Sequence, residues 1–298
     1  MQLKSITPHL ALLGTNVAWG LAYPMYHMVL PNYIDPVSIL TATLIISALI
    51  SLLPMLWEPY ERVERHDILS LIGAALLIAV IRKGLLIFAL SKTNPIDGSI
   101  ISTFTPIVVL IISIIVGVEH FNVKKAVGLL LGLGGALGVI LTSSQSGDTH
   151  SHDVVVGNIM VLSCAIISAI YMVWFKSLLK RYSPNTVMRW MFCIAAIFVT
   201  PFGIKPLLAT NFSAMPTHII WAVAYVMIVP TYLPNLLLNY ALESVPPTVS
   251  GTYTYIQPII AGAITMILGF GAPQWETIAF AILIFLGVGI VIRSYDSH

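Results

Sequence analysis

Long apolar segments separated by short polar ones constrain this 298-residue chain more than any other feature. A helix needs about 20 apolar residues to cross the hydrocarbon of a bilayer. Because an unpaired backbone group in lipid costs several kcal/mol, such segments are expected to be helical. Ten segments of this kind lie at residues 8–29, 36–57, 68–90, 95–117, 122–142, 154–176, 184–204, 216–242, 246–270 and 275–293. The sequence therefore predicts an all-α integral membrane protein with ten transmembrane helices.

Composition supports the same class and excludes others. Hydrophobic residues make up 58% of the chain and charged residues only 9%, whereas soluble domains carry about 25% charged residues. These values exclude a soluble enzyme, a nucleic-acid-binding protein and a disordered chain. Cys164 and Cys193 both lie inside apolar segments, so we expect free, buried thiols and no disulfide.

The positions of lysine and arginine predict the orientation. Ten spans place both ends of the chain on one side of the membrane. Nine of the 14 cationic residues fall on that side, and only Lys92 and Lys205 fall on the other. Because lysine and arginine favour cytoplasmic loops, both termini are expected to be cytoplasmic.

An internal repeat is visible when the chain is displaced by 152 residues. Residues 88–140 then share twelve identities with residues 240–292, and Pro106 meets Pro258. With a displacement of 148 residues, Asp35-Pro36 meets Ser183-Pro184. The pattern predicts a duplication of one five-helix unit.

We expect the first repeat to occupy residues 1–146, an external linker residues 147–153 and the second repeat residues 154–298. Since five is odd, the second copy must enter the membrane from the opposite side. Inverted repeats of this kind place a substrate site near the bilayer midplane, at the interface between the repeats. This architecture predicts transport by alternating access.

Several short motifs resemble the EamA domain, the repeat unit of the drug/metabolite transporter superfamily. They are Trp19-Gly20, Asp35-Pro36, Ala89-Leu90, Pro106 with the apolar run to Gly117 and Glu119, Gly132-x-x-Gly135, Ala169-Ile170-Tyr171, Ala241-Leu242 and Pro258. The resemblance implies a ten-helix inner-membrane transporter that exports amino acids or other small metabolites. It also implies that the fifth and tenth helices lie outside the central cavity.

Two cations in the middle of the third segment are the sharpest local signal. Placing Arg82 or Lys83 at the centre of a membrane helix costs about 2.5–3.5 kcal/mol on insertion scales. Adjacent residues differ by about 100° around a helix, so both cannot point into one narrow pore. We expect Lys83, and with less weight Arg82, to line the cavity and bind a carboxylate or phosphate. The alternative is an ion pair or carbonyl contact that only locks helices together.

Aromatic and amide side chains could complete a substrate pocket, because small-molecule sites combine apolar walls with a few polar groups. Helical spacing groups the candidates within their segments. They are Asn16, Trp19 and Tyr23; Ser102; Tyr171 and Trp174; Asn235 and Asn239; and Tyr253 and Gln257. The alternative for each is an ordinary interhelical hydrogen bond.

Prolines and glycines suggest mechanical roles. Pro106 and Pro258 occupy equivalent positions in the two copies and are predicted to be gating hinges, with simple packing kinks as the alternative. Gly128, Gly132, Gly135 and Gly138 predict one closely packed helix face, within the monomer rather than in a dimer.

No acidic residue lies in the middle of a predicted span. Proton- and sodium-coupled transporters commonly use embedded carboxylates, so we expect facilitated export or exchange. The alternative is an antiporter of nucleotide sugars or phosphorylated metabolites, since either cation could meet a phosphate. No catalytic or metal-binding motif indicates an enzyme, a cofactor or a metal. The expected partners are a small-molecule substrate and membrane lipid, without nucleic acid, in a monomer or weak homodimer.

Overall fold

A computed structural model describes residues 6–57, 61–117, 123–143, 151–175, 178, 181–242, 245 and 253–293, and these contain helices but no β-strand. The elements of the first half are α1 (Ile6–Val29), α2 (Pro36–Leu52), η1 (Leu53–Leu56), α3 (Arg65–Ala74), η2 (Ala75–Arg82), α4 (Lys83–Leu90), α5 (Pro95–Ser102), α6 (Thr105–Ile115) and α7 (Val123–Ser143). Those of the second half are α8 (Ser151–Trp174), α10 (Pro184–Ala209), η3 (Phe212–Ala214), α11 (Thr217–Ile228), α12 (Tyr232–Leu242), η4 (Tyr253–Tyr255), α14 (Ile256–Ile267) and α15 (Trp275–Arg293).

The helices follow the predicted segments in order, but three segments are interrupted. The third contains the π-helical stretch η2, the fourth breaks between α5 and α6, and the eighth bends by 42° between α11 and α12. Within the described residues, six helices are long and apolar enough to cross a membrane, or seven if the bent pair is one span. The count of ten stays a prediction.

The beginning of α8 falls within the predicted linker. Helix α8 begins at Ser151, so the last three residues of the linker 147–153 are helical, while residues 144–150 lie outside the described part of the chain. An acidic residue stabilises the first turn of a helix, and Asp153 occupies that turn. Asp153 also accepts a 2.5 Å hydrogen bond from Lys92 Nζ, two residues after the end of α4.

Matching caps begin the second helix of each half. Asp35 accepts hydrogen bonds from the backbone nitrogens of Val37 and Ser38 at the start of α2. Ser183 accepts one from Thr186 at the start of α10. Each cap is followed by proline at the first helical position, where no backbone hydrogen bond is lost. Asp35-Pro36 and Ser183-Pro184, which align in the sequence, therefore both cap the first turn of a helix.

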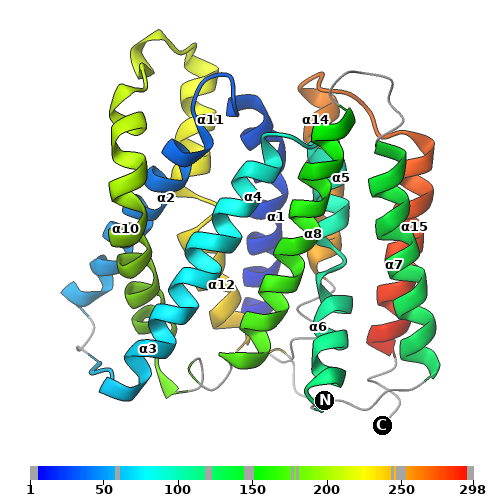
Figure 1. The fold of residues 1–298 in the computed structure, drawn as a ribbon, viewed down its shortest axis with the longest axis horizontal. Coiled ribbons are helices and arrows are strands. Elements are labelled where there is room, and N and C mark those ends of the chain that lie inside the picture. Colours follow the sequence, from blue (N-terminus) through cyan, green and yellow to red (C-terminus); the bar gives the residue numbers. More distant parts are fainter. Residues whose placement is uncertain are drawn as a thin grey trace.

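The two halves run in opposite directions. In Figure 1, α1 begins at the lower end of the bundle and runs upward, whereas α8 begins at the upper end and runs downward. Helix α15 ends at the lower end, where α3, α7 and α10 begin. The cations Arg65, Lys124 and Arg181 therefore lie at this lower end, and Lys92 lies at the upper end. The sequence prediction had separated them in the same way.

Helix packing connects the halves through equivalent elements. Helix α2 packs along α10, and α7 packs along α15 as a pair at one side of the bundle (Figure 1). Helix α1 contacts α11, α12 and α14, while α8 contacts η2, α4, α5 and α6. The predicted glycine face is confirmed within the monomer, since a Cβ atom at Gly135 or Gly138 would meet Phe280 of α15.

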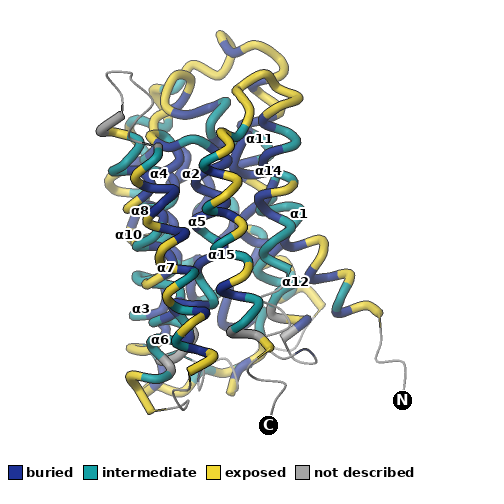
Figure 2. The backbone as a smooth tube through the Cα atoms, turned by 90° about the vertical axis from the view of Figure 1, so that its right-hand side faces the viewer, coloured by how far each residue is buried: buried dark blue, intermediate teal, exposed yellow. Residues whose placement is uncertain are grey.

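Apolar side chains cover the outside of the bundle as well as its core. Leu130, Ile197, Leu208, Trp221 and Ile267 are each at least 69% exposed, and the outward-facing turns of the helices are exposed in Figure 2. Soluble monomers rarely expose large continuous apolar patches. The exposed apolar side chains therefore fit a lipid-facing surface.

Candidate functional site

The two cations of the third segment lie where the helix changes its winding. Residues 75–82 form the π-helix η2, and α4 continues from Lys83. π-Helical turns are rare and occur frequently at functional sites. The side chains of Arg82 and Lys83 point to different neighbours, as their adjacent positions in the sequence predicted.

Arg82 faces α8. Its Nε donates a 2.5 Å hydrogen bond to Ser168 Oγ, and Ser168 Oγ donates to the Cys164 carbonyl at 2.8 Å. Cys164, a buried free thiol as expected, lies 3.5 Å from the Arg82 carbonyl. Cys193 is also free, but it is only partly buried, contrary to the expectation. The guanidinium is thus held against α8 through one of its five N–H groups.

Lys83 faces α1. The residue is 7% exposed, and its Nζ lies 5.6 Å from the centre of the Tyr26 ring. In the described part of the chain, neither Lys83 nor Arg82 forms an ion pair with a carboxylate. A buried ammonium without a counter-ion is costly, and the aromatic face offsets only part of that cost.

Three predicted residues of α1 contact three different elements. Asn16 Oδ1 accepts a 2.7 Å hydrogen bond from Gln257 of α14, and both side chains are buried. Trp19 Nε1 donates to the Pro230 carbonyl at 3.1 Å, in the break between α11 and α12.

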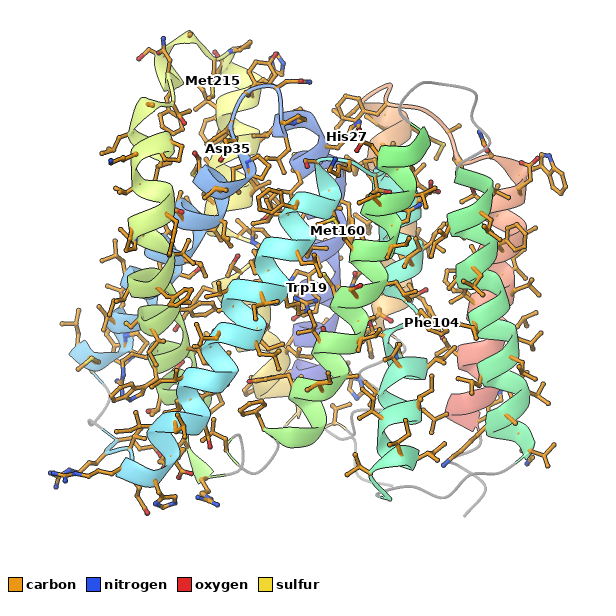
Figure 3. All side chains as sticks on the ribbon, viewed as in Figure 1. Trp19, His27, Asp35, Phe104, Met160 and Met215 are labelled. Atoms are coloured by element: carbon orange, nitrogen blue, oxygen red, sulfur yellow. The ribbon has the colours of Figure 1, made fainter. Side chains whose placement is uncertain are left out.

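The third residue, Tyr23, donates a 2.5 Å hydrogen bond to Ser102 of α5. Trp19 lies about halfway between the two ends of the bundle (Figure 3). Helix α1 therefore connects α5, α14 and the α11–α12 break through polar side chains that lie along about two turns around Trp19.

Other predicted residues lie elsewhere. Tyr171 stacks on Phe175 and directs its hydroxyl to Met191 Sδ of α10. Tyr253 hydrogen-bonds His9 near the beginning of α1. Asn235 donates to the Thr231 carbonyl within its own helix region. The side chains of Trp174 and Asn239 lie outside the described residues.

The prolines stand at the beginnings of helices rather than inside continuous ones. Pro106 is in the first turn of α6, after the break at Thr103 and Phe104. Pro258 is in the first turn of α14, after the short helix η4. A proline in a first turn removes no helical hydrogen bond. The interruption that precedes each proline is thus the more deformable feature.

Two residues of the site were not predicted, Tyr26 and Ser168. Tyr26 continues the spacing of Trp19 and Tyr23 along α1, at i+7 and i+3, and this pattern could have identified it. Ser168 precedes Tyr171 by one turn in an apolar helix, which carries little signal. In the described residues, no three His, Cys, Asp or Glu side chains gather closely enough to hold a metal ion.

Comparison with known proteins identifies the family to which this architecture belongs. The EamA-like transporter family matches residues 6–141 and, a second time, residues 155–293. The uncharacterized transporter YetK of Bacillus subtilis is 25% identical over 179 residues, which is 59% of this chain and 53% of YetK. The match thus spans about half the length of YetK.

Two further comparisons cover nearly the whole chain. The uncharacterized transporter YyaM of Bacillus subtilis is 19% identical over 293 residues, 96% of this chain and 93% of YyaM. A solved crystal structure superimposes with a TM-score of 0.62 at 17% identity over 96% of this chain and 97% of the other, which shows a shared fold. The double family match covers most of the sequence, and the chain belongs to the EamA-like transporter family of the drug/metabolite transporter superfamily.

Proposed function

We propose that this protein exports amino acids or similar small metabolites across the cell inner membrane by alternating access, through facilitated diffusion or exchange. Ten spans form two inverted five-helix repeats, with both termini in the cytoplasm. We also propose that the solute carries an anionic group, and one observation supports this. Two cations, Arg82 and Lys83, lie inside the bundle without a carboxylate partner among the described residues.

The packing between the halves supports the inverted repeat. Exchanging each element for its equivalent in the other half turns the most extensive contacts of α1, with α11, α12 and α14, into those of α8 with η2, α4, α5 and α6. The smaller contacts of α1 with α4 and α5, and of α8 with α7, do not follow this exchange. The pairs α2–α10 and α7–α15 each exchange into themselves. A pseudo-two-fold axis in the membrane plane, as in other inverted-repeat transporters, has this property.

The conformation described is closed around the polar residues of α1. Asn16 is 2% exposed and Gln257 is 6% exposed, so solute cannot reach this region without movement. The interruptions between α5 and α6 and between α11 and α12 lack continuous helical hydrogen bonds and bend at the lowest cost. Pro106 and Pro258 lie beside equivalent interruptions, at η4 for Pro258, and retain their proposed role as hinges.

Transport in liposomes tests the proposal. Purified protein is reconstituted and exchange of labelled solutes is measured with and without a pH gradient. Lys83→Met keeps an unbranched side chain that is one atom shorter and removes the charge, and transport should fall about tenfold or more. Lys205→Met, at an exposed position, is the matched control and should stay within about twofold of the wild type.

Equal transport by Lys83→Met and the wild type would remove Lys83 from the site. Strict dependence on an imposed gradient would contradict facilitated diffusion or exchange. The pair of adjacent cations also favours a second candidate, an antiporter of nucleotide sugars or phosphorylated metabolites. Exchange of labelled sugar phosphates in the absence of amino acid exchange would select that candidate.

A further inference from the structure

Among the described residues, two ion pairs join the halves of the molecule, one at each end of the bundle. Both connect the third segment, which runs from α3 through η2 to α4, with α8 or the residues that follow it. At the upper end, Lys92 Nζ lies 2.5 Å from Asp153 Oδ1. At the lower end, Arg181 Nη1 lies 2.9 Å from Asp67 Oδ2. We call these contacts the upper latch and the lower latch.

Between the latches, the third segment and α8 meet at Arg82. Its Nε donates a hydrogen bond to Ser168 Oγ, and both η2 and α4 pack along α8. Ser168 stands near the middle of the stretch from Asp153 to Arg181, so the Arg82 contact lies between the two latches. Rocking about such a contact opens one end as it closes the other, which alternating access requires.

The lower latch is the more extensively bonded of the two. Asp67 accepts hydrogen bonds from Arg181 Nη1 at 2.9 and 3.0 Å and from Tyr182 at 2.8 Å, and its side chain is only 9% exposed. Beside it, Glu61 accepts hydrogen bonds from the backbone nitrogen and the hydroxyl of Ser183. Hydrogen bonds to a carboxylate are about twice as strong as those between neutral groups. Separating the segments at this end breaks all of these bonds.

The upper latch is weaker. The side chains of Lys92 and Asp153 are 37% and 51% exposed, and ion pairs at exposed positions contribute little because water and salt screen them. Next to this pair, Thr93 donates a hydrogen bond to Asn158, and both residues are buried but uncharged. The upper end therefore opens at a lower cost in free energy than the lower end.

The equivalent pairing in the other orientation is that of α1 with α11 and α12. There Trp19 donates to the Pro230 carbonyl and Tyr225 donates to the Ala18 carbonyl, so neutral side chains connect the helices. Helix pairing of this kind therefore does not by itself require charged groups. An ion pair at each end of the pairing with α8 points to a role beyond packing.

We propose that the two latches are the gates of the transport cycle and that their unequal strengths set its resting state. The lower latch keeps the cytoplasmic end closed, and the protein at rest opens preferentially toward the outside. The inference rests on the proposed function, from which it takes the orientation in the membrane and the two access states.

Cys164 is a native reporter of opening at either end. It lies on α8 next to Arg82 and is 3% exposed, so water reaches it only when the third segment moves away from α8. The rate of its alkylation by a membrane-impermeant thiol reagent is measured in oriented vesicles, with the reagent on the cytoplasmic or on the external side. Cys193→Ala removes the other free thiol, and no solute is needed.

Alkylation of the wild-type Cys164 should be faster from the external side. Asp67→Asn should accelerate alkylation from the cytoplasmic side at least about tenfold. Asp153→Asn should accelerate alkylation from the external side about two- to fivefold. Glu64→Gln is the matched control for Asp67→Asn, because Glu64 lies at the same end but pairs with His66 of its own half, and it should leave both rates unchanged.

Two further variants keep the test decisive if Asp67→Asn folds poorly. Arg181→Gln removes the other partner of the lower latch from a half-exposed position and should also accelerate alkylation from the cytoplasmic side. Lys92→Asp combined with Asp153→Lys exchanges the charges of the upper latch and should restore the wild-type rate from the external side.

Faster alkylation of the wild type from the cytoplasmic side would overturn the inference. So would unchanged cytoplasmic rates in both variants of the lower latch. Solute exchange in liposomes distinguishes this failure from that of the proposed function. Exchange without the expected changes at Cys164 refutes the latches alone, whereas the expected changes without exchange of any solute support the latches and refute the transporter.

Discussion

Replacing Gly287 by alanine tests how closely the two halves are packed. A Cβ atom at Gly287 of α15 would lie 2.5 Å from the Gly128 carbonyl oxygen and 2.6 Å from the Gly132 nitrogen of α7. Carbon–oxygen contacts between helices are normally about 3.3 Å or longer. Because both obstructing atoms belong to the backbone, no rotamer change relieves the clash, and α7 and α15 must separate by about 0.8 Å.

Overpacking of this kind costs about 1–3 kcal/mol. Gly289→Ala is the matched control, since a Cβ atom there meets nothing within 4 Å. Both glycines lie in α15. Replacing either one by alanine should stabilise the helix by about the same 0.5–1 kcal/mol, because glycine is less favourable than alanine within a helix. The difference between the two variants therefore isolates the clash, and Gly287→Ala should be less stable by about 1–3 kcal/mol.

Thermal and denaturant unfolding of the purified variants in one detergent measures this difference. The expected order of stability is Gly289→Ala, wild type and then Gly287→Ala. Equal stabilities of the two variants would show that α7 and α15 do not pack through Gly287, and the pairing of the halves at this side of the bundle would be wrong.

Two further predictions concern the contacts between the beginning of α3, with the residues before it, and the beginning of α10, with the residues before it. Tyr182 donates a 2.8 Å hydrogen bond to Asp67, so Tyr182→Phe should lower the free energy of unfolding by about 0.5–1.5 kcal/mol; an unchanged value would refute the contact. Partial burial raises the pKa of Glu61, but hydrogen bonds from Thr186 and Ser183 lower it more, and the pKa lies below its ordinary value. The stabilisation from Glu61 should therefore be complete above the ordinary pKa of a glutamate and be lost as pH falls through the lowered pKa. The free energy of unfolding of Glu61→Gln, measured as a function of pH, should lack this contribution. Identical pH profiles of the variant and the wild type would contradict the prediction.

Several features of the fold could be predicted because they depend on neighbours in the sequence. The apolar segments mark the helices, since segment length and hydropathy are local properties. Asp35 and Ser183 mark helix starts because a cap acts on nitrogens two or three residues away. The bend between α11 and α12 lies at Pro230 and Pro234, and proline has no backbone N–H to donate to a helical hydrogen bond, so this local feature can be read from the sequence.

The site was predicted only in part. Spacing along α1 selected Asn16, Trp19 and Tyr23, and all three form hydrogen bonds with residues outside α1, Asn16 with α14 and Tyr23 with α5. The same reasoning selected Tyr171 and Tyr253, which instead contact Met191 and His9. Helical spacing states which side chains share a face, but it does not state which neighbour that face meets.

The sequence by itself determined the class of protein, the order of the helices, the duplication and the two cations within a span. These follow from hydropathy, caps and self-similarity, which act over a few residues or can be read directly. Only the tertiary structure decided that residues 75–82 wind as a π-helix, that Arg82 meets Ser168, and that Asn16 meets Gln257. These contacts join residues 86 and 241 positions apart, and their partners are chosen by how whole helices pack. Such contacts therefore exist only once the helices have packed together, and a single segment of the sequence does not determine them.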